Sequence, residues 1–175
     1  MGVKSTFTPY GLNWIVIAAN VACWPLLQLG IAAAVTRMNP DRFTRDTWYS
    51  HVPGWETGFY RRWLRIRRWK QMLPDGAPWV GGHFRKKTLK RRDPAYLRQF
   101  AAETRRGEAA HWLMFACFPI FFLWNPPWAR TVMVVYAAIV NLPCIVVQRY
   151  NREAIRRLLL LSPPAPVAAG NASPS

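Results

Sequence analysis

The stretch ETRRGEAAHW, which runs from Glu103 to Trp112, has the residue types and spacing best suited to acid–base chemistry. On a helix, Glu108 and His111 are three positions apart and share one face. A carboxylate beside a histidine raises the basicity of the imidazole and fixes its tautomer. This pattern therefore predicts a general base, His111, which Glu108 orients to take a proton from an alcohol.

A second interpretation of the same stretch involves no catalysis. Glu103 and Glu108 would then only form ion pairs with Arg105, Arg106 or other basic residues. Isolated ion pairs are commoner than catalytic sites, so the spacing alone does not decide between the two interpretations. The position at the edge of an apolar stretch favours a function, because ionisable groups are costly there.

A second polar cluster ends another apolar stretch, NLPCIVVQRYNR. Its polar members are Asn141, Gln148, Arg149, Asn151 and Arg152. A positive-inside stop signal explains the two arginines but not the three amides. We expect both clusters to lie at the same side of the membrane. There the amides would supply hydrogen bonds, and an arginine would stabilise a developing oxyanion.

Three apolar runs are expected to position these clusters. They cover residues 13–35, 109–124 and 129–148, and a helix needs ~20 residues to cross a bilayer core. NPPW, at 125–128, should turn the chain, so the second and third runs predict a helical hairpin. The first run is longer than the core of a signal peptide and is interpreted as a retained anchor. The expected fold is an all-α membrane protein with about three transmembrane helices.

Composition and charge favour a membrane over nucleic acid. The chain has 24 Lys and Arg against eight Asp and Glu, a formal net charge of +16, but ten residues are Trp and 51% are hydrophobic. Tryptophan and cations gather at membrane interfaces that contain anionic lipid. Because eighteen of the basic residues lie between Arg37 and Arg106, this segment and the C-terminus are expected to be cytoplasmic in a multi-pass cell-membrane protein.

The basic segment between the first two runs is expected to be helical. Residues 58–73 interleave apolar and basic residues at helical spacing, which predicts one amphipathic helix in the bilayer surface. Asp93 and Pro94 are typical of a helix N-terminus, and this helix should continue into the second span. We expect one membrane-embedded domain over residues 1–161, followed by a flexible Pro/Ala-rich tail at 162–175.

The cysteines do not indicate a metal site. Cys23, Cys117 and Cys144 lie in apolar runs without metal-ligand spacing and are interpreted as small buried apolar residues. The chain has no Gly-x-Ser-x-Gly motif and no cysteine beside a histidine, so no covalent nucleophile is predicted.

Two motifs together resemble a known family. ETRRGEAAHW, followed at a similar distance by NLPCIVVQRYNR, resembles the glycosyl-4,4'-diaponeurosporenoate acyltransferase family of staphyloxanthin-type carotenoid biosynthesis. WKQMLPDG, which contains Asp75, is similar to a further segment of that family. The resemblance covers roughly residues 61–161, and the family's pattern departs from this chain after QRYNR.

The resemblance implies transfer of a fatty-acyl group to a sugar hydroxyl of a glycosylated carotenoid or a related glycolipid. From residue chemistry, Glu103 would bind sugar hydroxyls, and Asp75, Arg105 and Arg106 are further candidate substrate-binding residues. Acyl-CoA or acyl carrier protein would be the donor, with no bound cofactor or metal. The alternatives are a transferase for other prenyl or lipid substrates, a non-catalytic partner of such enzymes in the membrane, and a peripheral protein that binds anionic lipid through the basic segment.

Overall fold

The protein, described from a computed structural model over residues 13–73 and 89–161, consists there of helices joined by loops and turns, with no β-strand in this described part. The all-α class predicted from the sequence is therefore confirmed for this part of the chain. The long helices are α1 (Trp14–Arg37), α4 (Pro94–Ala116) and α5 (Pro127–Leu161). The short ones are η1 (Pro40–Phe43), α2 (Gly54–Arg62), α3 (Ile66–Trp69), η2 (Lys70–Met72) and η4 (Phe118–Leu123).

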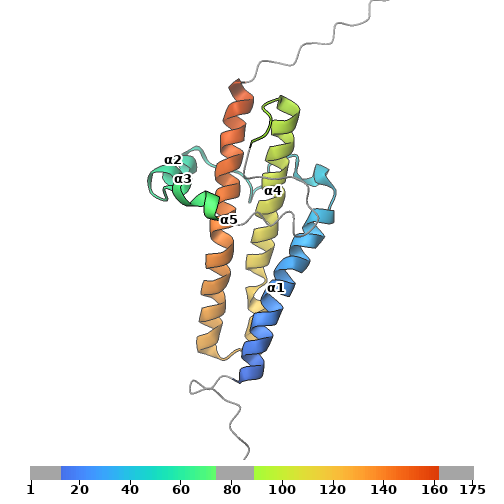
Figure 1. The fold of residues 1–175 in the computed structure, drawn as a ribbon, viewed down its shortest axis with the longest axis vertical. Coiled ribbons are helices and arrows are strands. Elements are labelled where there is room, and N and C mark those ends of the chain that lie inside the picture. Colours follow the sequence, from blue (N-terminus) through green and yellow to red (C-terminus); the bar gives the residue numbers. More distant parts are fainter. Residues whose placement is uncertain (1–12, 74–88, 162–175) are drawn as a thin grey trace, which may run out of the picture.

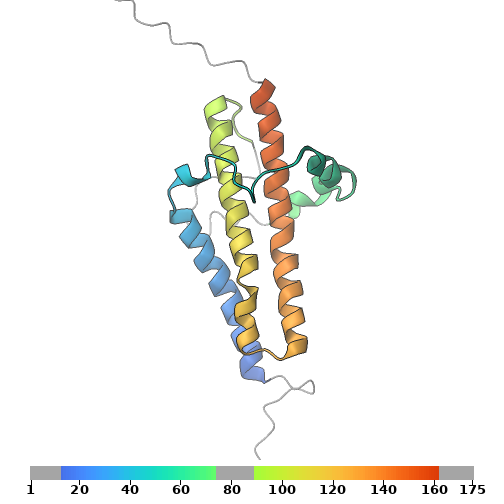
Figure 2. The same ribbon diagram turned by 180° about the vertical axis from the view of Figure 1, so that it is seen from behind.

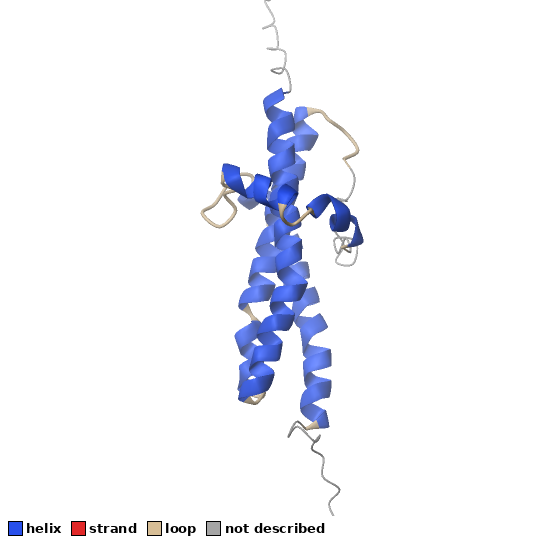
Figure 3. Cartoon of the chain, turned by 90° about the vertical axis from the view of Figure 1, so that its left-hand side faces the viewer, coloured by secondary structure: helices blue, strands red, loops and turns tan. Residues whose placement is uncertain are grey.

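The three long helices form a bundle in which α4 lies between α1 and α5 (Figures 1 and 2). The α4 and α5 helices run antiparallel and make the largest contact between elements. The short helices between α1 and α4, which are η1, α2, α3 and η2, lie across the long ones near the middle of the bundle (Figure 3). Two motifs far apart in the sequence thus face each other across the α4–α5 contact.

The sequence explains where the long helices begin. Asn13 caps α1, because its side chain accepts a hydrogen bond of 2.9 Å from the backbone N–H of Ile15. Asp93 caps α4, because its side chain accepts a hydrogen bond of 2.9 Å from the backbone N–H of Tyr96. Pro94 occupies the first helical position. The predicted start of this helix and its continuation into the second apolar run are confirmed.

Two of the described helices, α1 and α5, are long and apolar enough to cross a membrane. Only 11% of the most apolar stretch of α1 and 17% of that of α5 is buried inside the protein. A core helix of a soluble protein would bury far more of such a stretch, so these exposed apolar faces indicate a membrane protein.

The predicted second span is divided between two elements. Residues 109–124 form the end of α4 and then η4, which contains Pro119. These elements run beside α5 to the turn before Pro127, so the predicted hairpin is present (Figure 1). That this divided segment is a third crossing stays a prediction.

The middle segment differs from its prediction. One helix over 58–73 was predicted, but the chain turns at Arg65, whose φ of 46° is left-handed, and continues as α3 and η2. The reason is burial, because Ile66 is fully buried in a cluster with Tyr60 and Tyr150. On one straight helix Tyr60 and Ile66 would point about 120° apart, so they could not share this cluster.

Packing at the two ends of the bundle fixes the register of its helices. At one end, Trp24 of α1 stacks on Phe121 of η4 with ring centroids 4.2 Å apart, next to buried Ala137 of α5. At the other end, Leu97 and neighbouring residues of α4 pack against Ile155 of α5. Residues 74–88, which include Asp75, and the predicted tail at 162–175 lie outside the described residues.

Candidate active site

The α4–α5 contact brings the two predicted polar clusters together. Glu108 of α4 forms ion pairs of 2.8 Å with Arg149 and 2.6 Å with Arg152, both on α5. His111 Nδ1 lies 3.1 Å from Asn141 Oδ1. The structure therefore places members of the two clusters in contact, and their expected location at one side of the membrane stays a prediction.

Glu108 is the buried centre of the site. Its side chain is fully buried, and besides the two arginines it accepts a hydrogen bond of 3.3 Å from Trp112 Nε1. An unpaired carboxylate is strongly disfavoured in such a place, but two guanidinium groups stabilise it. These contacts of the carboxylate run to two arginines and an indole, whereas the sequence predicted that it orients His111.

Arg149 connects three parts of the chain through all five of its N–H groups. It binds the Glu56 carboxylate at 2.9 Å and the Glu108 carboxylate at 2.8 Å. It also donates hydrogen bonds to two backbone carbonyls, that of Tyr49 at 2.8 Å and that of His51 at 2.7 Å. A guanidinium has five donors, so an oxyanion could reach Arg149 only by displacing one of these acceptors.

Arg152 continues the series of ion pairs. Besides Glu108, it donates to the carbonyl of Ser50 and lies 4.0 Å from the Asp46 carboxylate. Asp46 in turn forms an ion pair of 2.7 Å with Arg105, which lies on α4. We call this alternating series the ion-pair chain; its members are Glu56, Arg149, Glu108, Arg152, Asp46 and Arg105.

The His111–Asn141 pair lies further along the bundle from these charges. Asn141 is fully buried, and its Nδ2 donates 2.9 Å to the carbonyl of Ala137 one turn earlier on α5. This bond fixes the amide so that Oδ1 points to His111, and an amide oxygen only accepts hydrogen bonds. The Nδ1 atom therefore carries the proton, and the lone pair of a neutral imidazole is on Nε2.

The distance between the two parts of the site follows from helix geometry. Asn141 and Arg149 lie on the same helix, so they are about 12 Å apart along its axis. Asn141 belongs to the apolar part of α5, whereas Arg149 follows it. The histidine pair is therefore placed deeper in the apolar region than the ion-pair chain.

The other residues predicted for the site mostly hold elements together. Glu103 forms an ion pair with Arg106. Arg106 also donates a hydrogen bond of 3.1 Å to the carbonyl of Thr36 at the end of α1. The side-chain oxygen of Asn151 accepts a hydrogen bond of 3.3 Å from Lys70 of η2. These contacts tie α1 and η2 to the α4–α5 pair.

Gln148 is different, because it offers a buried polar atom. Its side-chain Oε1 is shielded from solvent and has no hydrogen-bond partner among the described residues. A buried acceptor without a partner is unfavourable by about 1–3 kcal/mol, so it is well suited to receive a polar ligand group. Its place on α5 is between Asn141 and Arg149.

Sequence reasoning missed two acids of the ion-pair chain, Asp46 and Glu56. Glu56 also accepts a hydrogen bond from Tyr60. Burial is the main cause that raises the pKa of Tyr60, and the bond to Glu56 raises it further, so Tyr60 stays a neutral phenol. The scarcity of acidic residues could have indicated these two partners. The chain has only eight acidic residues at a net charge of +16, so each of them was a candidate partner for a buried arginine.

Comparison with known proteins bears on this arrangement of residues. Residues 45–160, which include α2, the ion-pair chain and the His111–Asn141 pair, match the family described as glycosyl-4,4'-diaponeurosporenoate acyltransferase. The chain belongs to the glycosyl-4,4'-diaponeurosporenoate acyltransferase family. The protein is therefore an acyltransferase, as the resemblance of the two motifs implied.

Members of the glycosyl-4,4'-diaponeurosporenoate acyltransferase family in Staphylococcus aureus cover most of this chain. The proteins of that name from strains USA300 and NCTC 8325 / PS 47 are each 31% identical to it over 140 residues. The matched region is 78% of this chain and 83% of each relative. No solved structure matches the chain.

Proposed function

We propose that this acyltransferase moves a fatty-acyl group from a thioester donor to a sugar hydroxyl of a glycosylated carotenoid, with His111 as general base. The His111–Asn141 pair carries the proposal, because the amide oxygen that accepts from Nδ1–H places the lone pair of the neutral ring on Nε2, where it can take a proton. The names of the Staphylococcus aureus relatives supply the class of acceptor. A related glycolipid would use the same chemistry.

In the proposed step, Nε2 of His111 takes the proton of the sugar hydroxyl while the sugar oxygen attacks the thioester carbonyl carbon. The new C–O ester bond forms and the C–S bond breaks. The imidazolium then returns its proton to the leaving thiolate. The donor would be acyl-CoA or acyl carrier protein, which acts as a substrate rather than a resident cofactor.

The other residues of the site have supporting roles in this proposal. Glu108, Arg149 and Arg152 hold α4 and α5 in register, so that Asn141 stays opposite His111. For Arg149 this role replaces the oxyanion contact that we expected, because every N–H of its guanidinium is already engaged. An oxyanion contact from Arg152 stays part of the proposal. Gln148 would accept a hydrogen bond from the sugar through its buried Oε1.

The membrane arrangement is part of the same proposal. The bundle would cross the bilayer three times, through α1, through the end of α4 with η4, and through α5. The basic residues of 37–106 and the C-terminal arginines favour a cytoplasmic location for the ion-pair chain. The carotenoid acceptor would then approach His111 sideways from the bilayer, and the thioester donor would approach from the cytoplasm.

A product assay in cells tests this function. The chain is expressed in a strain that makes a glycosylated C30 carotenoid but has no acyltransferase for it, and extracts are analysed by mass spectrometry. We expect a mass increase of one fatty-acyl group, which His111→Ala abolishes and His51→Ala, a change at another, exposed histidine, retains. Product from His111→Ala at the wild-type level would disprove the base, and no product from the wild type in the membrane fraction would disprove the acceptor.

A further inference from the structure

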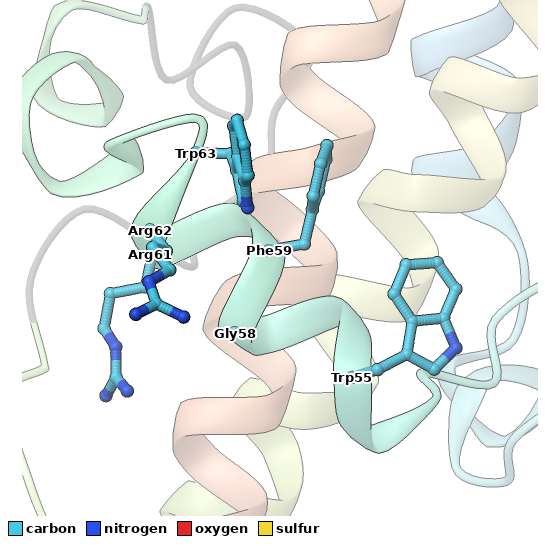
Figure 4. A pocket seen from close by; sticks show the side chains of 6 residues that line it. All are labelled: Trp55, Gly58, Phe59, Arg61, Arg62 and Trp63. Carbon is cyan, nitrogen blue, oxygen red and sulfur yellow. The ribbon is translucent and has the colours of Figure 1, made fainter.

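The outer face of α2 carries a hollow that the proposed reaction does not use. It has a volume of about 600 Å³ and is lined by Trp55, Gly58, Phe59, Arg61, Arg62 and Trp63. Figure 4 shows the five larger side chains projecting from α2, with Gly58 between Trp55 and the two arginines along the helix. None of the lining residues is acidic.

The aromatic side chains around this hollow are unusually exposed. Trp55 is 71% exposed, Trp63 75% and Phe59 43%. Removing such a ring from water is favourable by about 2–3 kcal/mol when the burial is complete. Three rings together on one short helix therefore favour a partner with apolar groups.

The same hollow is cationic. Arg61 and Arg62 lie on its rim and are exposed. The single acid of α2, Glu56, is turned the opposite way, where it pairs with Arg149 at 2.9 Å. The partner should therefore combine a negative charge with its apolar groups.

The position of α2 in the bundle indicates where such a partner comes from. Glu56 bound to Arg149, together with Tyr60 packed against Tyr150, fixes α2 beside α5 where the apolar part of α5 ends. That level corresponds to the headgroup layer of a bilayer. Tryptophan rings and arginines gather at this layer, and anionic lipid supplies the complementary charge.

We propose that the α2 hollow binds the headgroup of an anionic phospholipid. Arg61 and Arg62 would bind the phosphate, while Trp55, Phe59 and Trp63 would contact the glycerol and the first methylenes of the acyl chains. The site goes beyond the proposed acyl transfer: it rests on the proposed placement of α5 in the bilayer but not on the reaction, because none of its residues belongs to the ion-pair chain or to the His111–Asn141 pair.

The test uses the full-length protein in a zwitterionic detergent, titrated with short-chain phosphatidylglycerol while its thermal unfolding is followed. We expect this lipid to raise the unfolding temperature, and the double variant Arg61→Gln/Arg62→Gln to weaken its apparent affinity by about tenfold or more. Gly58→Leu should have the same effect by filling the hollow. A Cβ at Gly58 meets nothing within 4 Å, so a side chain can leave the backbone there without a clash at its first atom.

Controls separate the possible sources of the effect. Arg42→Gln/Arg45→Gln removes two exposed charges elsewhere and should leave the lipid response unchanged. An equal response to phosphatidylcholine would overturn the proposal, since the charge would not matter. An equal rise in unfolding temperature with inorganic phosphate or coenzyme A would also overturn the proposal. So would a Gly58→Leu protein that responds to the lipid like the wild type.

Discussion

At the scale of single residues, the His111–Asn141 contact makes a specific prediction. Asn141→Leu keeps the volume but removes the acceptor for Nδ1–H, so the tautomer is no longer fixed. We expect kcat to fall on the order of 10²-fold, the lower end of what a general base contributes, with KM unchanged. Asn141→Asp retains an acceptor oxygen and should retain more activity than Asn141→Leu. Steady-state kinetics on membranes with equal amounts of enzyme give the order, and the reverse order would contradict the assignment.

Glu108 should show the opposite pattern to His111. Glu108→Gln leaves two buried guanidinium groups without their shared carboxylate, so we expect a loss of stability of about 3–5 kcal/mol. His111→Ala should lose activity with a much smaller change in stability. Thermal unfolding in detergent, measured beside the product assay, separates the two. A Glu108→Gln protein that unfolds like the wild type but makes no product would mean that Glu108 acts in catalysis instead.

The sequence predicted which residues meet in this site better than it predicted how they pair. Spacing of three positions on one helix placed Glu108 beside His111. The partner of each was nevertheless set by the register between α4 and α5, which depends on packing at both ends of the bundle. A pattern within one helix holds no information about that register. This is why Asn141 opposite His111 was not foreseen.

At the scale of elements, a buried amide pair joins α1 to the far end of the hairpin. Asn20 and Asn125 exchange two side-chain hydrogen bonds of 2.8 and 2.9 Å, and Trp124 Nε1 donates a further 2.8 Å to Asn20. Together with Arg106 bound to the carbonyl of Thr36, this pair holds α1 against the hairpin along its length. It supports the interpretation of the first apolar run as a retained anchor.

The amide pair can be tested with a double-mutant cycle. Asn20→Leu removes the hydrogen bonds that Asn125 Oδ1 and Trp124 Nε1 make to Asn20 and should destabilise the protein by about 1–3 kcal/mol per unpaired group. Asn20→Leu/Asn125→Leu removes both amides, so its loss should be smaller than the sum of the single losses. Thermal unfolding of the four proteins measures the coupling. Strictly additive losses would show that the two amides do not depend on each other.

The element that the sequence predicted least well is the middle segment. Apolar residues at helical spacing over 58–73 fitted one amphipathic helix, and local periodicity contains no sign of the left-handed turn at Arg65. The turn is stabilised by a tertiary contact, the burial of Ile66 against Tyr150 of α5. Capping residues at 93–94 were predictable because both the cap and its partner are local.

At the scale of the whole molecule, charge and apolar exposure together predict its topology. The turn before Pro127 and the N-terminus should face outward, whereas the ion-pair chain and the end of α5 face the cytoplasm, because basic residues concentrate there. An even number of crossings would place the two ends of the chain on the same side. The three crossings proposed here place them on opposite sides.

Cysteine labelling in intact cells distinguishes these topologies. After Cys23, Cys117 and Cys144 are replaced by alanine, a single cysteine is introduced at Trp128 or at Leu160, which are 49% and 72% exposed. A membrane-impermeant maleimide should label the first variant in intact cells and the second only after lysis. Labelling of both in intact cells would mean that α5 does not cross the membrane between these two positions. Labelling of Leu160→Cys alone would invert the orientation and place the ion-pair chain outside, away from any cytoplasmic acyl donor.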